Sequence, residues 1–393
     1  MAVSFAQLPQ VGRRLRQPEH AWAVKHLPFA IQPFMIAPVL PGETLKNALI
    51  QVRAVTQPVK SALSGWWLEH YLFYVKHRDL GDADTLVNMM LDPSVKAPNS
   101  AAADAALYTS AGRPRFVAQC LQAVVTTWFR DRGEAWNAYL IGTLPAAKLQ
   151  KEYWAQSANT AALSNVGDFA ADLDASGTIM ASEVSAAYER WQFLRANNLT
   201  DATYEDYLRS YGVRVELEEE NKPELLRYSR DWVYPSNTVD PATGSPSSAV
   251  SWVVSERADK DRFFKEPGFI FGVTVCRPKV FRSGQVATAS QLLDDAYAWL
   301  PAILRDDPMT SVRPVTPAGM VPSATANQIV DLRDLFLYGD QFTNYDIVAT
   351  PDTGAVALPT GPNWRYPTKA MVDNLFVPAS PYGVLQDGVA RLS

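Results

Sequence analysis

The chain has 393 residues, of which 47% are hydrophobic and 20% charged, and its formal net charge is −5. This composition supports a large buried core and excludes a wholly disordered or collagen-like chain. The mild acidity argues against a general nucleic-acid-binding protein. The 28 prolines indicate many chain reversals, and the 16 Phe, 16 Tyr and 11 Trp suit sheet faces and protein interfaces.

The cysteines and the distribution of apolar residues further narrow the class of protein. Cys120 and Cys276 lie far apart in the sequence, and without a Cys-x-x-Cys pair a zinc framework is excluded. We expect two free buried thiols, with a single disulfide as the alternative. The first 17 residues lack the apolar region of a signal peptide, and no stretch of about 20 apolar residues predicts a membrane span.

Basic residues gather near the N-terminus. Arg13, Arg14, Arg16 and Lys25 stand against the single acid Glu19 within the first 30 residues. This excess fits a basic arm that faces nucleic acid. A solvated, partly ordered terminus is the alternative.

The first strand signals lie in residues 29–77. Residues 45–56 follow a Pro-Gly turn at 40–44 and alternate in their second half, with Ile50, Val52 and Ala54 on one face. Trp66–Lys76 is a strongly aromatic strand candidate, in which His70 faces away from Glu69.

The middle of the chain favours helices and loops. Apolar residues recur at helical spacing in 115–130, 182–197 and 204–211, and residues 213–250 are polar and turn-rich. Strand character returns at 250–255 and at 269–276, which is apolar enough for a strand buried on both faces. After it we expect a short helix at 291–300 and, in an otherwise irregular remainder, short segments at 329–338 and 347–358.

This order of strands, helices and loops, and then strands again is not an alternating βαβ pattern. It favours an antiparallel barrel with long insertions between its strands. We expect one domain over 1–393, with an N-terminal arm at 1–28, a helical and loop insertion region at 80–249 and a loop-rich extension at 306–393.

Catalytic motifs are absent from the sequence. It has no phosphate-binding Gly-x-x-x-x-Gly-Lys, no His-Glu-x-x-His and no Gly-x-Ser-x-Gly. The four histidines are expected to be structural, so no enzyme and no cofactor is predicted.

One segment matches a calcium-binding loop. Asp172, Asp174, Ser176 and Glu183 have the spacing of the oxygen ligands in an EF-hand, with Gly177 at the turn. The segment that precedes the loop contains helix breakers, and the sequence has a single such loop. An Asp/Ser-rich helix entrance is the preferred interpretation, and calcium is the alternative.

Three blocks of sequence resemble the major capsid proteins of the Microviridae, especially the gokushovirus-like ones. Residues 36–44 (IAPVLPGET) are similar to the family's "VLPGDT" turn, and 71–78 (YLFYVKHR) to its "FFVPNR" strand end. Residues 203–213 resemble "RYxExLxxxFGV", and 264–272 resemble "FxEHGYIIGL". The order and spacing of the blocks agree with the family over roughly residues 30–305. The departures are a shorter chain, a missing Gly-Gly before the second block, and Pro267 in place of the family's histidine.

The resemblance implies an eight-stranded antiparallel jelly-roll barrel, mainly β, with long helical and loop insertions between strands. It implies about sixty copies in an icosahedral (T=1) capsid around circular single-stranded DNA, assembled in the bacterial host cytoplasm. The implied partners are further copies of the chain, other phage structural proteins, the packaged DNA and a host surface receptor, without a membrane. Six tryptophans are candidates for contacts between subunits, with packing inside the subunit as the alternative: Trp22, Trp128, Trp136, Trp154, Trp232 and Trp364.

Two other classes of protein stay open. One is a jelly-roll carbohydrate-binding, decoration or spike module of a phage, which would bind sugar through exposed tryptophans. The other is an enzyme on a β scaffold, which would need carboxylates or histidines clustered in one cleft.

Overall fold

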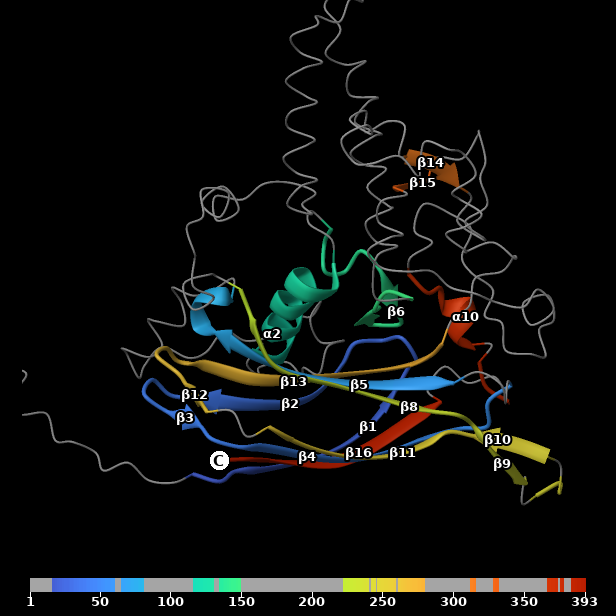
Figure 1. The fold of residues 1–393 in the computed structure, drawn as a ribbon, viewed down its shortest axis with the longest axis horizontal. Helices are drawn as coiled ribbons and strands as arrows, with labels where there is room; N and C mark the ends of the chain where they lie inside the picture. Colours follow the sequence, from blue (N-terminus) through green and yellow to red (C-terminus); the bar gives the residue numbers. More distant parts are fainter. Residues whose placement is uncertain are drawn as a thin grey trace, which may run out of the picture.

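The computed structural model describes residues 16–60, 65–80, 116–130, 134–149, 222–239, 242–244, 246–258, 261–279, 312–315, 328–331, 366–373, 375–377 and 383–393. Antiparallel strands dominate these residues, so the fold is mainly β, as predicted (Figure 1). No helix among them is long and apolar enough to cross a membrane.

Eight strands form two four-stranded sheets. Sheet 1 has the order β1-β16-β4-β11 and consists of β1 (Glu19–His26), β16 (Val384–Leu392), β4 (Ala48–Thr56) and β11 (Ser251–Ala258). Sheet 2 has the order β2-β13-β5-β8 and consists of β2 (Gln32–Val39), β13 (Gly268–Pro278), β5 (Trp66–Lys76) and β8 (Glu224–Val233).

Shorter elements complete the described fold. Four two-stranded sheets pair β3 (Thr44–Leu45) with β12 (Arg262–Phe263), β6 (Leu140–Ile141) with β7 (Leu144–Pro145), β9 (Ser236–Val239) with β10 (Pro246–Ala249), and β14 (Val312–Val315) with β15 (Gln328–Asp331). The helices are α2 (Phe116–Val124), continued by a π-helical turn at Val125–Phe129, the 3-10 turn His77–Asp79, and α10 (Lys369–Asp373).

The strands of the two large sheets pair in a nested order. The first strand, β1, is antiparallel to the last, β16, and β2 is antiparallel to β13. Inside these pairs, β4 is antiparallel to β11 and β5 to β8. The chain therefore folds back on itself as one long hairpin whose successive pairs are divided between two sheets.

Sheet 1 and sheet 2 pack face to face across a common core, and Figure 1 shows them as two stacked layers. Sheet 1 contributes Trp252, Val52 and Ala390, and sheet 2 contributes Leu68 and Ile270. Residues alternate between faces along each strand, so every second side chain points into this core. Burial of these large apolar side chains is the main stabilising contribution between the layers.

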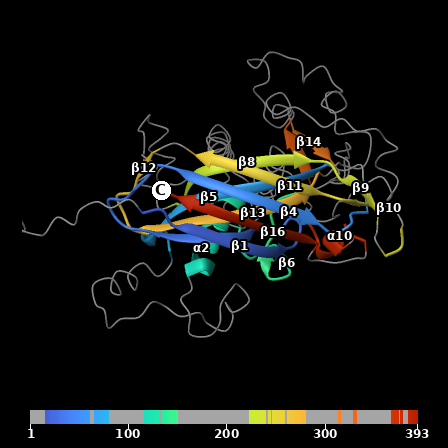
Figure 2. The same cartoon turned by 90° about the horizontal axis from the view of Figure 1, so that it is seen from below.

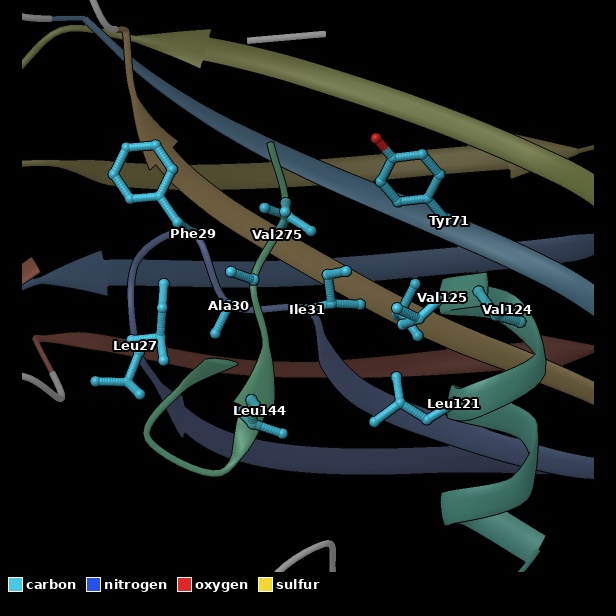
Figure 3. Close-up of a cluster of buried hydrophobic side chains, with 14 of the residues drawn as sticks. Leu27, Phe29, Ala30, Ile31, Tyr71, Leu121, Val124, Val125, Leu144 and Val275 are labelled. Carbon is cyan, nitrogen blue, oxygen red and sulfur yellow. The ribbon is translucent and has the colours of Figure 1, made fainter. Parts of the chain in front are cut away.

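A second core covers the other face of sheet 2. Tyr71 of β5 and Val275 of β13 lie on this face and share the core with α2, the β6-β7 hairpin and residues 27–31 (Figure 3). The two central strands of sheet 2, β5 and β13, are therefore enclosed on both sides, and all eleven residues of β13 are buried. The prediction that 269–276 forms a strand buried on both faces is confirmed.

Sheet 1 presents its other face to the outside, and Figure 2 shows its four strands side by side from that direction. In β4, Ile50, Val52 and Ala54 are buried, whereas Arg53 and Val55 are exposed. The predicted alternation of this strand is confirmed, as is the turn before it, where Gly42 has a φ of 85°.

Further predictions are confirmed in the core elements. Trp66–Lys76 forms β5 over its whole predicted length, and α2 with its π-helical turn lies within the helix predicted at 115–130. Cys120 and Cys276 are both free and buried, and burial raises the pKa of each thiol.

Three predicted regions contain strands that the sequence analysis did not assign. Strand β1 lies inside the predicted N-terminal arm 1–28, β8 and the β9-β10 hairpin lie inside the insertion region 80–249, and β16 lies inside the extension 306–393. The descriptions of 213–250 as turns, and of the chain's end as irregular, were wrong for these strands. The helices predicted at 182–197, 204–211 and 291–300, and the segment 347–358, lie outside the described residues; of 329–338, only the part within β15 is described.

Neighbouring residues of β11 provide a test of the layer arrangement. The side chain of Trp252 is 1% exposed and that of Val253 is 84% exposed. We expect Trp252→Ala to lower the free energy of unfolding by about 3–5 kcal/mol, because it leaves a cavity between the sheets. The matched control Val253→Ala should change it by less than about 0.5 kcal/mol in urea denaturation. Equal losses in the two variants would contradict the arrangement.

Candidate functional site

Aromatic and charged side chains meet at one end of sheet 2. Register places Trp67 of β5 opposite Trp232 of β8 on one side and Arg277 of β13 on the other. The Trp67 and Trp232 rings stack with centroids 5.3 Å apart, and the Arg230 guanidinium carbon lies 3.6 Å from the Trp67 ring centroid. A cation over an indole face at this distance is stabilising.

Glu69 is the centre of a buried ionic network beside this stack. Arg277 donates from Nη2 to both carboxylate oxygens of Glu69, at 2.9 and 3.2 Å, and Arg230 Nε lies 3.2 Å from Oε1. The Tyr71 hydroxyl donates to Oε2 at 3.0 Å, and the Tyr228 hydroxyl donates to Oε1 at 3.4 Å. One carboxylate therefore joins three neighbouring strands of sheet 2.

Opposing effects act on the pKa of Glu69. Burial alone would raise it, but the charges of Arg277 and Arg230 and the hydrogen bonds from Arg277 and Tyr71 outweigh burial and lower it. Burial, followed by the Glu69 charge, raises the pKa of Tyr71. The carboxylate stays ionised and both its oxygens accept hydrogen bonds, so the network acts as a structural clamp and not as a general base.

The aromatic side chains next to the clamp reach the surface. Trp232 is 42% exposed, and its ring centroid lies 4.7 Å from that of Tyr234, which is 52% exposed. Lys279 Nζ lies 5.7 Å from the Trp232 ring centroid. We call Trp67, Trp232 and Tyr234, with Arg230 and Lys279, the aromatic end of sheet 2. Exposed tryptophan, tyrosine and arginine are the residue types that carry binding energy at protein interfaces.

The predicted contact tryptophans have different positions. Trp232 lies at the aromatic end, and Trp128 is 48% exposed while its Nε1 donates to the Pro223 carbonyl at 2.9 Å. Trp136 is partly buried against the second core. Trp22 corrects the prediction, because it is buried in the first core, with its ring centroid 4.6 Å from that of Phe34. Trp154 and Trp364 lie outside the described residues.

The structure describes two of the four predicted basic residues, Arg16 and Lys25. Arg16 donates to Glu43 at 2.7 Å and to the Pro38 carbonyl at 3.0 Å, which fastens the segment before β1 to the turn at 40–43. Lys25 is exposed on the outer face of sheet 1. Arg13 and Arg14 lie outside the described residues.

No group of three or more metal-ligating side chains occurs among the described residues. The calcium-loop residues Asp172, Asp174, Ser176 and Glu183 lie outside them.

The sequence analysis did not identify the clamp. Glu69 was assigned to a face of the correct strand, but Arg230 lies in a region interpreted as turns and Arg277 lies just beyond the strand predicted at 269–276. The available signal was Glu69 itself, a charged residue in a strand that otherwise has no exposed face. A carboxylate buried in such a strand requires a cationic partner.

No protein-family model matches this chain, and no curated protein matches it.

The clamp can be tested through its most buried cation. Arg277→Met leaves Glu69 buried next to Arg230 alone, and we expect a loss of about 3–5 kcal/mol in the free energy of unfolding. Adding Glu69→Gln to this variant should restore part of the loss. The exposed pair of Arg391 and Glu19, at 2.8 Å, serves as control, and Arg391→Met should cost less than about 1 kcal/mol. Urea denaturation of these three variants, of Glu69→Gln alone and of the unaltered protein measures these values, and additive effects of the two clamp substitutions would refute the coupling.

Proposed function

We propose that this chain is a major capsid protein that resembles those of the Microviridae, and that its copies assemble into a small icosahedral shell around circular single-stranded DNA. The observation that carries the proposal is the nested strand order, in which the first strand pairs with the last and the pairs alternate between two packed sheets. This order supports an eight-stranded jelly roll, the fold expected from the resemblance.

The mechanical properties of the subunit support a shell-building function. A closed shell repeats the same contact at each symmetry-related position, so a subunit must hold its surfaces in fixed geometry. The doubly covered sheet 2 and the Glu69 clamp supply this rigidity. Two sheets packed face to face also leave few open strand edges, which lowers the risk of unwanted pairing.

The exposed aromatic residues support contact between copies. Trp232 and Tyr234 lie next to the β9-β10 hairpin, whose first strand is exposed at every residue and which projects beyond the two sheets (Figure 1). A two-stranded hairpin is marginally stable by itself. Association with a neighbouring subunit would cover both the hairpin and the aromatic end of sheet 2.

The DNA-facing function of the basic N-terminal residues rests on the sequence. Arg13 and Arg14 precede the described residues, and Lys25 contributes one exposed cation to sheet 1. Neutralisation of phosphates by such residues predicts binding that weakens as the salt concentration rises.

A carbohydrate-binding or decoration module is the second candidate, because jelly rolls also occur in lectins and because Trp232 and Tyr234 are exposed. A jelly roll is compatible with both functions, so the strand order does not distinguish them. The two candidate functions predict different assembly behaviour.

Assembly of the purified protein separates the two candidates. We expect electron microscopy to show uniform closed particles of about sixty copies when the full chain is concentrated with single-stranded DNA and the other phage structural proteins. A monodisperse monomer under every assembly condition, with binding to a glycan array, would contradict the capsid proposal.

The variant Trp232→Ala refines this test. Truncation of an interface tryptophan commonly costs at least 2 kcal/mol, so particle formation should require a protein concentration higher by about tenfold or more. Val253→Ser, on the exposed face of sheet 1, is the matched control for loss of an exposed apolar side chain. If Val253→Ser impaired assembly and Trp232→Ala did not, the contact would lie on sheet 1 and not at the aromatic end.

A further inference from the structure

A polar cluster lies inside the otherwise apolar core between the two sheets. It consists of His26 at the end of β1, Gln386 of β16 and His70 of β5, which are 0%, 0% and 2% exposed. Gln386 Nε2 lies 3.1 Å from His70 Nε2. The contact therefore crosses from sheet 1 to sheet 2.

The cluster is incompletely hydrogen-bonded. Both ring nitrogens of His26, Nδ1 of His70 and Oε1 of Gln386 are buried without a well-aligned partner. Each buried polar atom of this kind costs free energy even when the imidazole is neutral. A proton on either ring adds a charge that is cut off from water, which costs further free energy.

The surroundings offer little compensation for such a charge. The nearest carboxylate in sequence, Glu69, points to the opposite face of β5 and is held there by Arg277 and Arg230. The core-facing side chains of β2, β4 and β16 include no acid or base. The other titratable groups on the inward faces are His20 of β1, Cys276 of β13, Tyr74 and Lys76 of β5, and Glu224, Arg227 and Asp231 of β8, with Glu256 of β11 paired to Arg227 at 2.7 Å.

Strand β1 is the element of this contact that can leave at least cost. It is an edge strand, and in the described part of the chain it pairs with β16 alone. The main cost of its release is exposure of the Trp22 ring, which packs on Phe34 and so closely on Gly388 that a Cβ at Gly388 would lie 2.4 Å from the ring. Strand β5, in contrast, is paired on both sides and covered on both faces.

We infer that the contact of His26, Gln386 and His70 is acid-sensitive, and that it releases edge strand β1 below about pH 6 while the centre of sheet 2 stays closed. This property belongs to the fold of the single subunit and does not depend on the capsid proposal.

The direction of the pH effect follows from proton uptake. Burial lowers the pKa of His26 to about 4, and burial together with the neighbouring His26 lowers the pKa of His70 to about 3. Both values lie below the ordinary value of 6.5, so the open state binds more protons than the closed state. The closed state is fully stable above pH 6.5 and loses stability as the pH falls from 6.5 toward 4.

Hydrogen exchange of the full-length protein at pH 7.5 and 5.0 tests the inference. After correction for intrinsic rates, we expect the opening of β1 at pH 5.0 to increase by about 30-fold if one imidazole becomes accessible and by up to about 1,000-fold if both do. Peptides from β13 should change by less than about threefold. An unchanged β1, or a β13 that opens as far as β1, would overturn the inference.

Substitutions assign the effect to the cluster. The double variant H26Q/H70Q should lose the pH response of β1, whereas the control H20Q/H77Q should keep it. The chain has four histidines, so a response that survives in H20Q/H77Q leaves His26 and His70 as its only histidine sources even if H26Q/H70Q does not fold. Loss of the response in H20Q/H77Q would overturn the assignment.

Discussion

The enclosure of β5 and β13, the central strands of sheet 2, on both faces is the constraint on which the rest of the structure depends. A strand that is covered on both sides has no solvent-facing position, so every polar group in it must find a partner within the protein. In β13 this is achieved by nearly continuous apolar sequence from Gly268 to Cys276, with Thr274 bonded to the Glu69 carbonyl at 3.0 Å. The ionic clamp follows from the same constraint, because Glu69 and Arg277 can be accommodated there only as a pair.

Sheet 1 has the opposite character, and the difference determines what each layer can do. One of its faces is packed on sheet 2 and the other is open, so buried and exposed residues alternate along β4 and along the first residues of β11. It also brings the N-terminal strand β1 beside the C-terminal strand β16. The doubly covered layer thus supplies rigidity, whereas the edge of the single-faced layer holds the element that acid is expected to release.

The parts of the fold that the sequence predicted are those with strong local patterns. The alternation of Ile50, Val52 and Ala54, the aromatic run of β5 and the apolar run of β13 each specify a strand without reference to the rest of the chain. Strand β16 has no such pattern, because Asp387 and Gly388 interrupt its apolar residues. The absence of a side chain at Gly388 is explained by the Trp22 ring and the Gln51 carbonyl, which leave no room for a Cβ there. Strand β8 carries Arg227, Arg230 and Asp231, and such a charged sequence is typical of a loop. Its strand structure is explained only by tertiary contacts, in which Arg230 pairs with the buried Glu69 and Arg227 pairs with Glu256.

The candidate surfaces were predictable to a lesser degree, for a related reason. Composition indicates that tryptophans are available for contacts but does not show which of them the core uses. Trp22 and Trp232 each lie in a strand that also carries charged residues, yet one packs between the sheets and the other reaches the surface. Strand register decides between these outcomes, and register depends on pairings between residues that are more than 150 positions apart.

The pairing of the first strand with the last can be measured most directly by a designed disulfide. Leu392 N–H donates to the Pro18 carbonyl, so alternate pairs such as Ala21 and Val389 occupy non-hydrogen-bonded positions, where side chains approach most closely. The account predicts that A21C/V389C forms an intramolecular disulfide on mild oxidation, detected by mass spectrometry of the cleaved protein. It also predicts that A21C/V253C, which joins the two opposite edges of sheet 1, does not. A disulfide in the second variant but not in the first would contradict the nested order.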